Sequence, residues 1–120
     1  KERVLGVLID KSAIAFSFSQ LEANNNFIQK TFKGKNLIVA GNKTANLMVA
    51  FNSKLPDGTV LEFKPANEDL PALLTDNEGN TWDIFGHATD GPRKGEKLFP
   101  VPQMMGYWFA FAAFYPDIEL

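Results

Sequence analysis

The chain contains no cysteine and one histidine, His87, in 120 residues. The lack of cysteine excludes disulfides, thiol nucleophiles and thiolate metal sites, and it leaves the redox compartment open. A single histidine excludes a zinc site built from several histidines of one chain. The sequence therefore predicts neither a metal site nor a bound cofactor.

Clustered charge is also scarce, because the net charge is −2 and Lys and Arg are scattered singly. A nucleic-acid-binding surface needs a basic patch, so we expect no nucleic-acid partner. The most apolar segment, Met104–Tyr115, is far shorter than the roughly 20 residues that cross a bilayer, and it lacks the basic face of a membrane-surface helix. We expect no transmembrane segment. The sequence does not identify a partner, and a small molecule or another protein are both open alternatives.

The length predicts a single domain over residues 1–120. Because the chain starts at Lys1 rather than Met, we interpret it as trimmed or as part of a longer precursor. Period-two alternation and short apolar runs between turn residues predict about eight short strands. The expected segments are Val4–Asp10, Ala13–Gln20, Phe27–Phe32, Leu37–Ala40, Leu47–Phe51, Val60–Lys64, Ala72–Thr75, Thr81–Phe85 and Lys97–Val101.

Turn residues separate these segments. Three asparagines, Asn24–Asn26, tolerate left-handed backbone geometry, and Lys54–Thr59 contains Pro and Gly at turn positions. Gly86–Gly95 is expected to be a loop. The pattern predicts an α+β fold that is predominantly antiparallel β, barrel- or sandwich-like, with one C-terminal apolar helix packed on the sheet.

That helix is expected over Met104–Tyr115, between Pro102 and Pro116, with about three turns. One broad face of the expected helix carries Met104, Tyr107, Trp108, Phe111, Phe114 and Tyr115. The opposite face carries the small residues Gly106, Ala110 and Ala113, where a sheet would approach closely. We expect this uncharged helix to be buried across the sheet and to be structural.

Three stretches of the sequence resemble a known family. They are Gly79–Trp82, Gly91–Gly95 and Trp108–Pro116, and the opening Val4–Val7 followed by Ala13–Phe16 adds to them. They are similar to the Gly-Ser-x-Trp stretch, the Gly-Pro-x-x-Gly loop and the Trp-containing terminal helix of the bacterial and archaeal domain of unknown function 3179 family. The resemblance covers most of the chain. Because members are often longer and exported, it implies a cell-envelope location.

The chain departs from this family at Ala40–Asn46, where many members carry a Cys-Pro-x-Cys-Gly stretch. Closely spaced cysteines suggest metal or redox chemistry in those members, which cannot be carried over here. Asn42, Lys43 and Thr44 occupy this place and would be able to line a ligand pocket. The same three residues form a glycosylation pattern, and a plain polar connection is the simpler interpretation.

His87 is the first catalytic candidate, as a general base oriented by Asp83 or Asp90. The simpler interpretation is a histidine in a surface loop. The acidic segment Asp76–Asn80 lacks the spacing of a calcium loop and is better explained as a hairpin turn.

Arg93 and Lys94 would be able to bind an anion between two glycines, although the segment lacks phosphate-loop spacing. Trp82 would be able to form an aromatic wall for a ligand together with Trp108, but at strand and helix positions both are more often core residues.

Three functional hypotheses follow. The first is a non-catalytic binding or structural module of the bacterial cell envelope. The alternatives are an enzyme or ligand-processing domain that uses His87 with Asp83 or Asp90, and a degenerate member of a metal- or redox-binding family. The sequence favours a module that is not an enzyme, because no acid–base pair has telling spacing.

Overall fold

The computed structural model describes residues 3–42, 44–66, 69–115 and 117–118. These residues form three antiparallel sheets and two short helices. The strands are β1 Arg3–Ile9, β2 Ser12–Ser17, β3 Phe27–Phe32, β4 Lys35–Asn42, β5 Leu47–Asn52, β6 Phe63–Pro65, β7 Ala72–Asp76, β8 Thr81–Asp83, β9 Ala88–Asp90, β10 Phe99–Pro100 and β11 Gln103–Tyr107. The helices are α1 Phe18–Ala23 and α2 Trp108–Phe114.

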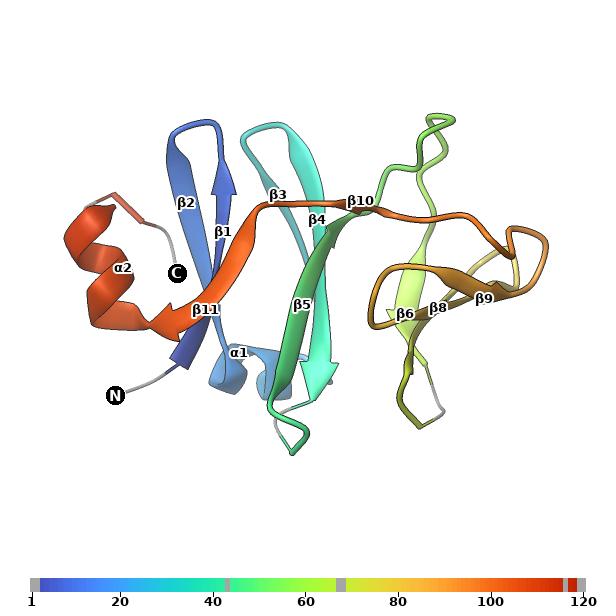
Figure 1. Cartoon of the computed structure of the whole chain (residues 1–120), viewed down its shortest axis with the longest axis horizontal. Coiled ribbons are helices and arrows are strands. Elements are labelled where there is room, and N and C mark those ends of the chain that lie inside the picture. Colours follow the sequence, from blue (N-terminus) through green and yellow to red (C-terminus); the bar gives the residue numbers. More distant parts are fainter. Residues whose placement is uncertain (1–2, 43, 67–68, 116, 119–120) are drawn as a thin grey trace.

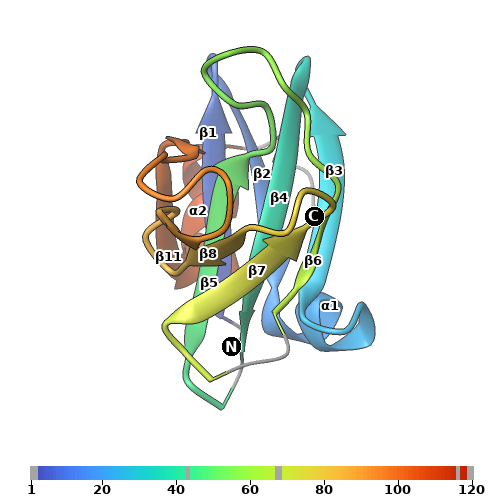
Figure 2. The same ribbon diagram turned by 90° about the vertical axis from the view of Figure 1, so that its right-hand side faces the viewer.

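The three sheets follow one another along the longest axis of the molecule, from left to right in Figure 1, with α2 outside the first. The first sheet has the order β11-β1-β2, the central sheet β10-β5-β4-β3, and the third sheet β6-β7-β8-β9. Figure 2 shows the third sheet in front of the central one, with β7 running obliquely across β4 and β5. The sheets are open rather than closed into a barrel, so the expected α+β, predominantly antiparallel fold is confirmed in its sandwich-like form.

The central strand β4 explains why the molecule has two main cores. Leu37 and Val39 point into the core shared with the first sheet, whereas Ile38 and Ala40 point into the core shared with the third. All four side chains are buried, because successive residues of a strand face opposite sides and both sides are covered. The continuous apolar run in the sequence therefore belongs to a strand with no solvent face.

The expected turns are confirmed in their backbone geometry. Asn25 and Asn26 have φ angles of 58° and 64°, in the left-handed region that asparagine tolerates. In the turn over 54–59, Gly58 has a φ of 90°, and the Leu55 N–H donates to the Thr59 carbonyl at 2.8 Å. The expected loop over 86–95 differs, because Ala88–Asp90 within it pairs with β8 as β9.

Helix α1 differs from the expectation, because the alternation over Ala13–Gln20 predicts a strand that continues to Gln20. A capping box starts this helix: Ser17 Oγ accepts from the Gln20 N–H at 3.1 Å, and Gln20 Oε1 accepts from the Ser17 N–H at 2.8 Å. The helix buries Phe18 and Leu21 in the first core. The Ser-x-x-Gln spacing over 17–20 indicates the start of a helix, but the alternation of the preceding residues predicts a continued strand.

The three-turn helix expected over Met104–Tyr115 is wrong in its first third. Gln103–Tyr107 is strand β11, which pairs with β1 so that Val4 lies opposite Gly106. The Gln103 side chain also links β11 to the central sheet, because its amide forms two 2.8 Å hydrogen bonds with the backbone of Ala50. Pairing with the open edge of β1 outweighs the local tendency of this segment to form a helix.

The expected orientation of α2 is also wrong. Ala110 and Ala113 are exposed, and the side chain that meets the first sheet is Phe111, which is 6% exposed. Gly6 and Gly106 form the floor beneath it, since a Cβ built on Gly6 would lie 2.4 Å from the Phe111 ring. The small residues that permit close approach are therefore in the sheet, and the large residue is in the helix.

Trp108 is half-buried against the small cluster formed by Val4, Ala15 and Phe111. We expect Trp108→Ala to lower the free energy of unfolding by about 1–2 kcal/mol, below the roughly 3–5 kcal/mol of a fully buried aromatic residue. Urea denaturation measures this loss. Phe85→Ala, at a side chain 66% exposed, is the matched control and should change stability by less than about 0.5 kcal/mol. Equal losses for the two variants would contradict this description of Trp108.

Candidate functional site

The backbone of His87 pairs with that of Lys97 in an isolated antiparallel β-bridge, and the His87 side chain is exposed. The Asp83 carboxylate accepts from the backbone N–H groups of Phe85 and His87, both at 2.9 Å, and Asp90 accepts from the backbone of Gly91. Among the described residues, the His87 ring forms no hydrogen bond. The two carboxylates thus hold turns of the backbone and do not orient the imidazole.

Next to the candidate residues over 42–44, Asn42 Oδ1 accepts from the Ala45 N–H at 3.1 Å. Thr44 is exposed, and Lys43 lies outside the described residues. Asn42 also lines a largely polar cavity of about 370 Å³. The cavity lies between Asn42 and the segments that flank the start of β7.

Arg93 is enclosed by carboxylates rather than open to an anion. Its side chain is 14% exposed and forms ion pairs with Glu78 at 2.7 Å and with Asp57 and Glu96 at 3.1 Å. Three loops of the third sheet are joined in this way. Lys94 is exposed, and its backbone N–H donates to the carbonyl of Gly91 within the same turn.

The hydrogen bonds of this cluster shift the pKa values of Asp57 and Arg93 in opposite directions. Hydrogen bonds from Thr59, and then from Arg93, lower the pKa of Asp57 to about 2. Hydrogen bonds to Glu78 and Asp57 raise the pKa of Arg93 above its ordinary value. A guanidinium held in this way stabilises the loops around it, and it leaves no positive charge for a ligand.

Trp82 is fully buried in the second core, so it forms no wall of an open site. Its indole Nε1–H donates to Asp76 Oδ2 at 2.7 Å. Asn80, which is 1% exposed, donates to the same carboxylate from its backbone and its side chain. The acidic turn over 76–80 is therefore built around a buried carboxylate that accepts from its own neighbours.

A strap over 98–103 connects all three sheets and roofs a cavity. The Leu98 N–H donates to the Gly86 carbonyl in the third sheet, β10 pairs with β5 in the central sheet, and the Pro102 carbonyl accepts from Leu8 in the first. In Figure 1 this segment runs across one end of the three sheets. Proline at 100 and 102 suits an edge segment, since it donates no ladder hydrogen bond.

The cavity under this strap, which we call the strap pocket, has a volume of about 590 Å³. Ligand pockets in proteins commonly fall between about 300 and 1,000 Å³ and have mostly apolar walls with a few polar groups. The apolar wall of the strap pocket consists of Leu8, Ile9, Leu55, Pro56, Phe99, Pro100, Val101 and Pro102. Its polar residues are Asp10, Lys35, Asn52 and Lys54.

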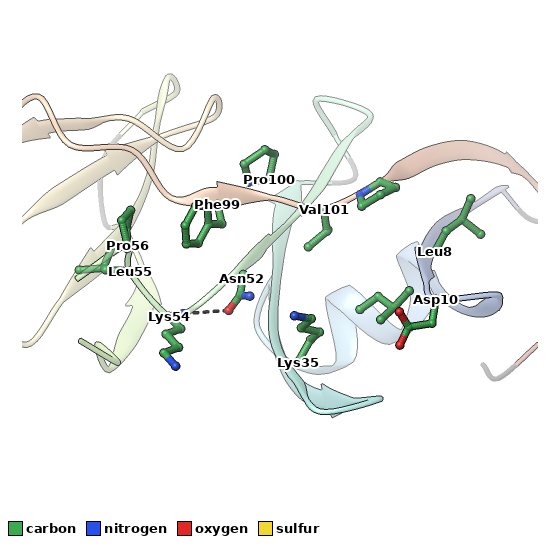
Figure 3. A pocket seen from close by; sticks show the side chains of 12 residues that line it. Leu8, Asp10, Lys35, Asn52, Lys54, Leu55, Pro56, Phe99, Pro100 and Val101 are labelled. Carbon is green, nitrogen blue, oxygen red and sulfur yellow. Dashed lines mark hydrogen bonds between the residues drawn. The ribbon is translucent and has the colours of Figure 1, made fainter. Parts of the chain in front are cut away.

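Figure 3 shows the Lys35 ammonium and the Asp10 carboxylate pointing toward the middle of the strap pocket, while Lys54 lies at its rim. Neither charged group of Asp10 or Lys35 forms an ion pair or a hydrogen bond with another described residue. Asn52 Oδ1 accepts from the Lys54 backbone N–H at 2.9 Å, and this hydrogen bond fixes the orientation of the Asn52 side-chain amide. The pocket thus offers an apolar wall opposite an ammonium group that is free to bind.

None of the strap pocket residues was a candidate in the sequence. Asp10 and Lys35 follow or begin strands in two different hairpins, and Phe99 belongs to the far end of the chain. Only the stacking of the sheets brings them together. The candidates from the sequence were polar turn residues, and the structure places most of them in hydrogen bonds that shape turns.

The fold and the pocket define a class: a three-layered, predominantly antiparallel β structure with a ligand-sized cavity at the junction of its sheets. Residues 1–118 match the family model described as Protein of unknown function (DUF3179), and the chain belongs to this family. The resemblance found in the sequence is thereby confirmed. Comparisons with curated proteins and with solved structures give no match. Within the described residues, no group of three or more acidic or histidine side chains is placed to hold a metal ion, and no helix is long and apolar enough to cross a membrane.

Proposed function

We propose that this domain is a non-catalytic binding module whose strap pocket takes a small carboxylate with an apolar body. The observation that carries the proposal is the Lys35 ammonium, which points into an apolar cavity without a partner among the described residues. A charge-assisted hydrogen bond to a carboxylate satisfies this group, and the wall under Phe99 takes the apolar part of the ligand.

The composition of the pocket supports binding rather than catalysis. Its described lining includes no histidine, hydroxyl or thiol side chain, and its Asp10 and Lys35 groups are exposed and have no described partner that would activate them as base or nucleophile. Two lysines and one aspartate give it a local charge of the opposite sign to the chain as a whole. An acidic ligand is therefore favoured over a neutral or basic one.

We expect Lys35→Met to weaken the binding of 3-phenylpropionate about tenfold, since a charged hydrogen bond contributes roughly 1.5–3 kcal/mol. Two-dimensional NMR titration measures this change and also locates the contact. The matched control is Lys64→Met, which removes the same charge from β6 outside the strap pocket and should leave affinity unchanged. The neutral amide, 3-phenylpropanamide, should bind more weakly than the acid to the wild-type protein.

Asp10→Asn distinguishes an acidic ligand from a zwitterionic one. Asp10 has a φ of 50°, which asparagine tolerates, so the turn should be preserved. Removal of this negative charge should strengthen the binding of 3-phenylpropionate a few-fold. Weaker binding, equal losses for the variants at Lys35 and Lys64, or chemical-shift changes outside the pocket would refute the proposal.

We further propose that the module works at the bacterial cell envelope. The support is the resemblance to family members that are often exported. Fractionation of cells that carry the full-length protein tests this location, and recovery in the cytosolic fraction alone would refute it without bearing on the strap pocket.

A further inference from the structure

The polar side of the strap pocket carries two groups that a plain carboxylate would not use. Asp10 and Asn52 line the pocket together with Lys35. Because the Lys54 N–H occupies Asn52 Oδ1, the Asn52 NH₂ group remains to donate, and it donates to no described residue. The Asp10 carboxylate accepts from no described residue either. A plain acid bound to Lys35 would be repelled by Asp10 and would leave the Asn52 amide unpaired.

The three polar groups lie in a defined order. Figure 3 shows the Lys35 ammonium between the Asn52 amide and the Asp10 carboxylate. They come from three parts of the chain, since Asn52 ends β5, Lys35 begins β4 and Asp10 follows β1. A ligand that satisfies all three groups needs a hydrogen-bond acceptor, a carboxylate and a hydrogen-bond donor in the same order.

An N-acylated amino acid with an apolar side chain carries these groups in that order. Its amide is planar and trans, so the N–H and the carbonyl point to opposite sides, and the carboxylate lies on the carbon next to the N–H. With the carboxylate on Lys35, the N–H donates to Asp10 and the carbonyl accepts from Asn52. The apolar side chain then packs on the wall under Phe99.

The charge and the volume of the strap pocket separate this ligand from a free amino acid. Two lysines and one aspartate leave one positive charge in excess, which matches a ligand with a single carboxylate. A free amino acid would add an ammonium group that the lysines repel. The volume of about 590 Å³ lies well inside the range of pockets that hold drug-sized ligands, so an acyl group fits beside the side chain.

We propose, on the basis of the function proposed above, that the strap pocket takes an N-acylated amino acid with an apolar side chain. Asp10 determines this specificity, because it accepts the amide N–H and repels an acid that has no donor beside its carboxylate. The last residue of a peptide chain has the same chemistry, since its carboxylate is free and its nitrogen is acylated.

Two ligands that differ in one hydrogen-bond donor test the role of Asp10. N-acetyl-L-phenylalanine has the amide N–H, and O-acetyl-L-3-phenyllactate has an ester oxygen in its place. In an NMR titration the amide should bind the wild-type protein about tenfold more tightly than the ester, as one hydrogen bond to a charged acceptor predicts. Asp10→Gly removes the acceptor and suits the φ of 50°, and it should bind both ligands equally. Asp69→Ala, at an exposed carboxylate outside the strap pocket, should keep the preference.

Equal binding of amide and ester by the wild-type protein, or a preference that persists in Asp10→Gly, would overturn the inference. The proposed function would stand if 3-phenylpropionate still bound through Lys35, whereas no binding of any of these acids would overturn both. Acetyl-Ala-Ala-Phe distinguishes the two sources of the ligand. Tighter binding than N-acetyl-L-phenylalanine assigns the strap pocket to the C-terminus of a peptide, and equal or weaker binding assigns it to a free N-acylated amino acid.

Discussion

Asp76→Ala is expected to lower the free energy of unfolding by about 3–5 kcal/mol, although the side chain belongs to a surface turn. Asp76 is 7% exposed and accepts from the backbone N–H groups of Glu78 and Asn80, from the Asn80 side chain and from the Trp82 indole. Alanine would leave these donors without an acceptor. Because Asn80 and Trp82 are almost fully buried, water cannot replace the carboxylate without opening the core.

Urea denaturation measures this loss, with two variants for comparison. Asp69→Ala removes an exposed carboxylate beside the start of β7 and should change stability by less than about 0.5 kcal/mol. Asp76→Asn keeps one acceptor oxygen but presents an amide to donors, and it should fall between the two. If Asp76→Ala matched Asp69→Ala, the network would not stabilise the fold.

The same carboxylate gives stability a pH dependence of defined sign. Burial alone would raise the pKa of Asp76, but hydrogen bonds from Trp82 and Asn80 outweigh it and lower the pKa below the ordinary value. The ionised form therefore stabilises the fold above the unfolded pKa of about 3.9, and this contribution is lost as pH falls through the lower folded pKa. Asp57, with a pKa of about 2, acts in the same direction. The urea midpoint should fall below pH 4, and it should fall less steeply for Asp76→Asn.

Patterns that depend on neighbouring residues were predictable from the sequence. The alternation of β2, the third strand over Phe27–Phe32 and the asparagine turn all follow from local geometry. The run over Leu37–Ala40 predicted a strand, but which of its residues faced which core depended on the order of the sheets.

Features that depend on distant partners were not predictable. Gln103–Tyr107 has no period-two pattern, and it becomes a strand because β1 offers an open edge. The strap pocket combines the end of one hairpin, the start of another and a late crossing segment. The candidate Arg93 was recognised by its charge, yet its role depends on three carboxylates that reach it from separate loops.

The joint between α2 and the first sheet permits a prediction in which two substitutions depend on each other. Phe111→Ala should lower the free energy of unfolding by about 3 kcal/mol, because the ring is 6% exposed and fills a notch over Gly6 and Gly106. Gly6→Ala should lower it by about 2–3 kcal/mol, since the new Cβ would lie 2.4 Å from Phe111 Cε1 and expel the ring.

In the Phe111→Ala background, Gly6→Ala should be neutral or slightly stabilising. The steric conflict is then gone, and alanine loses less conformational freedom than glycine when a strand forms. Urea denaturation of the four proteins of this double-mutant cycle gives the coupling, expected at about 2–3 kcal/mol. Gly106→Ala, whose Cβ would approach the ring to 3.0 Å, should show a smaller effect of the same kind. Additive losses would mean that the sheet itself requires Gly6. If Gly6→Ala destabilises the wild-type protein but stabilises Phe111→Ala, the glycine is required because it leaves space for the Phe111 ring.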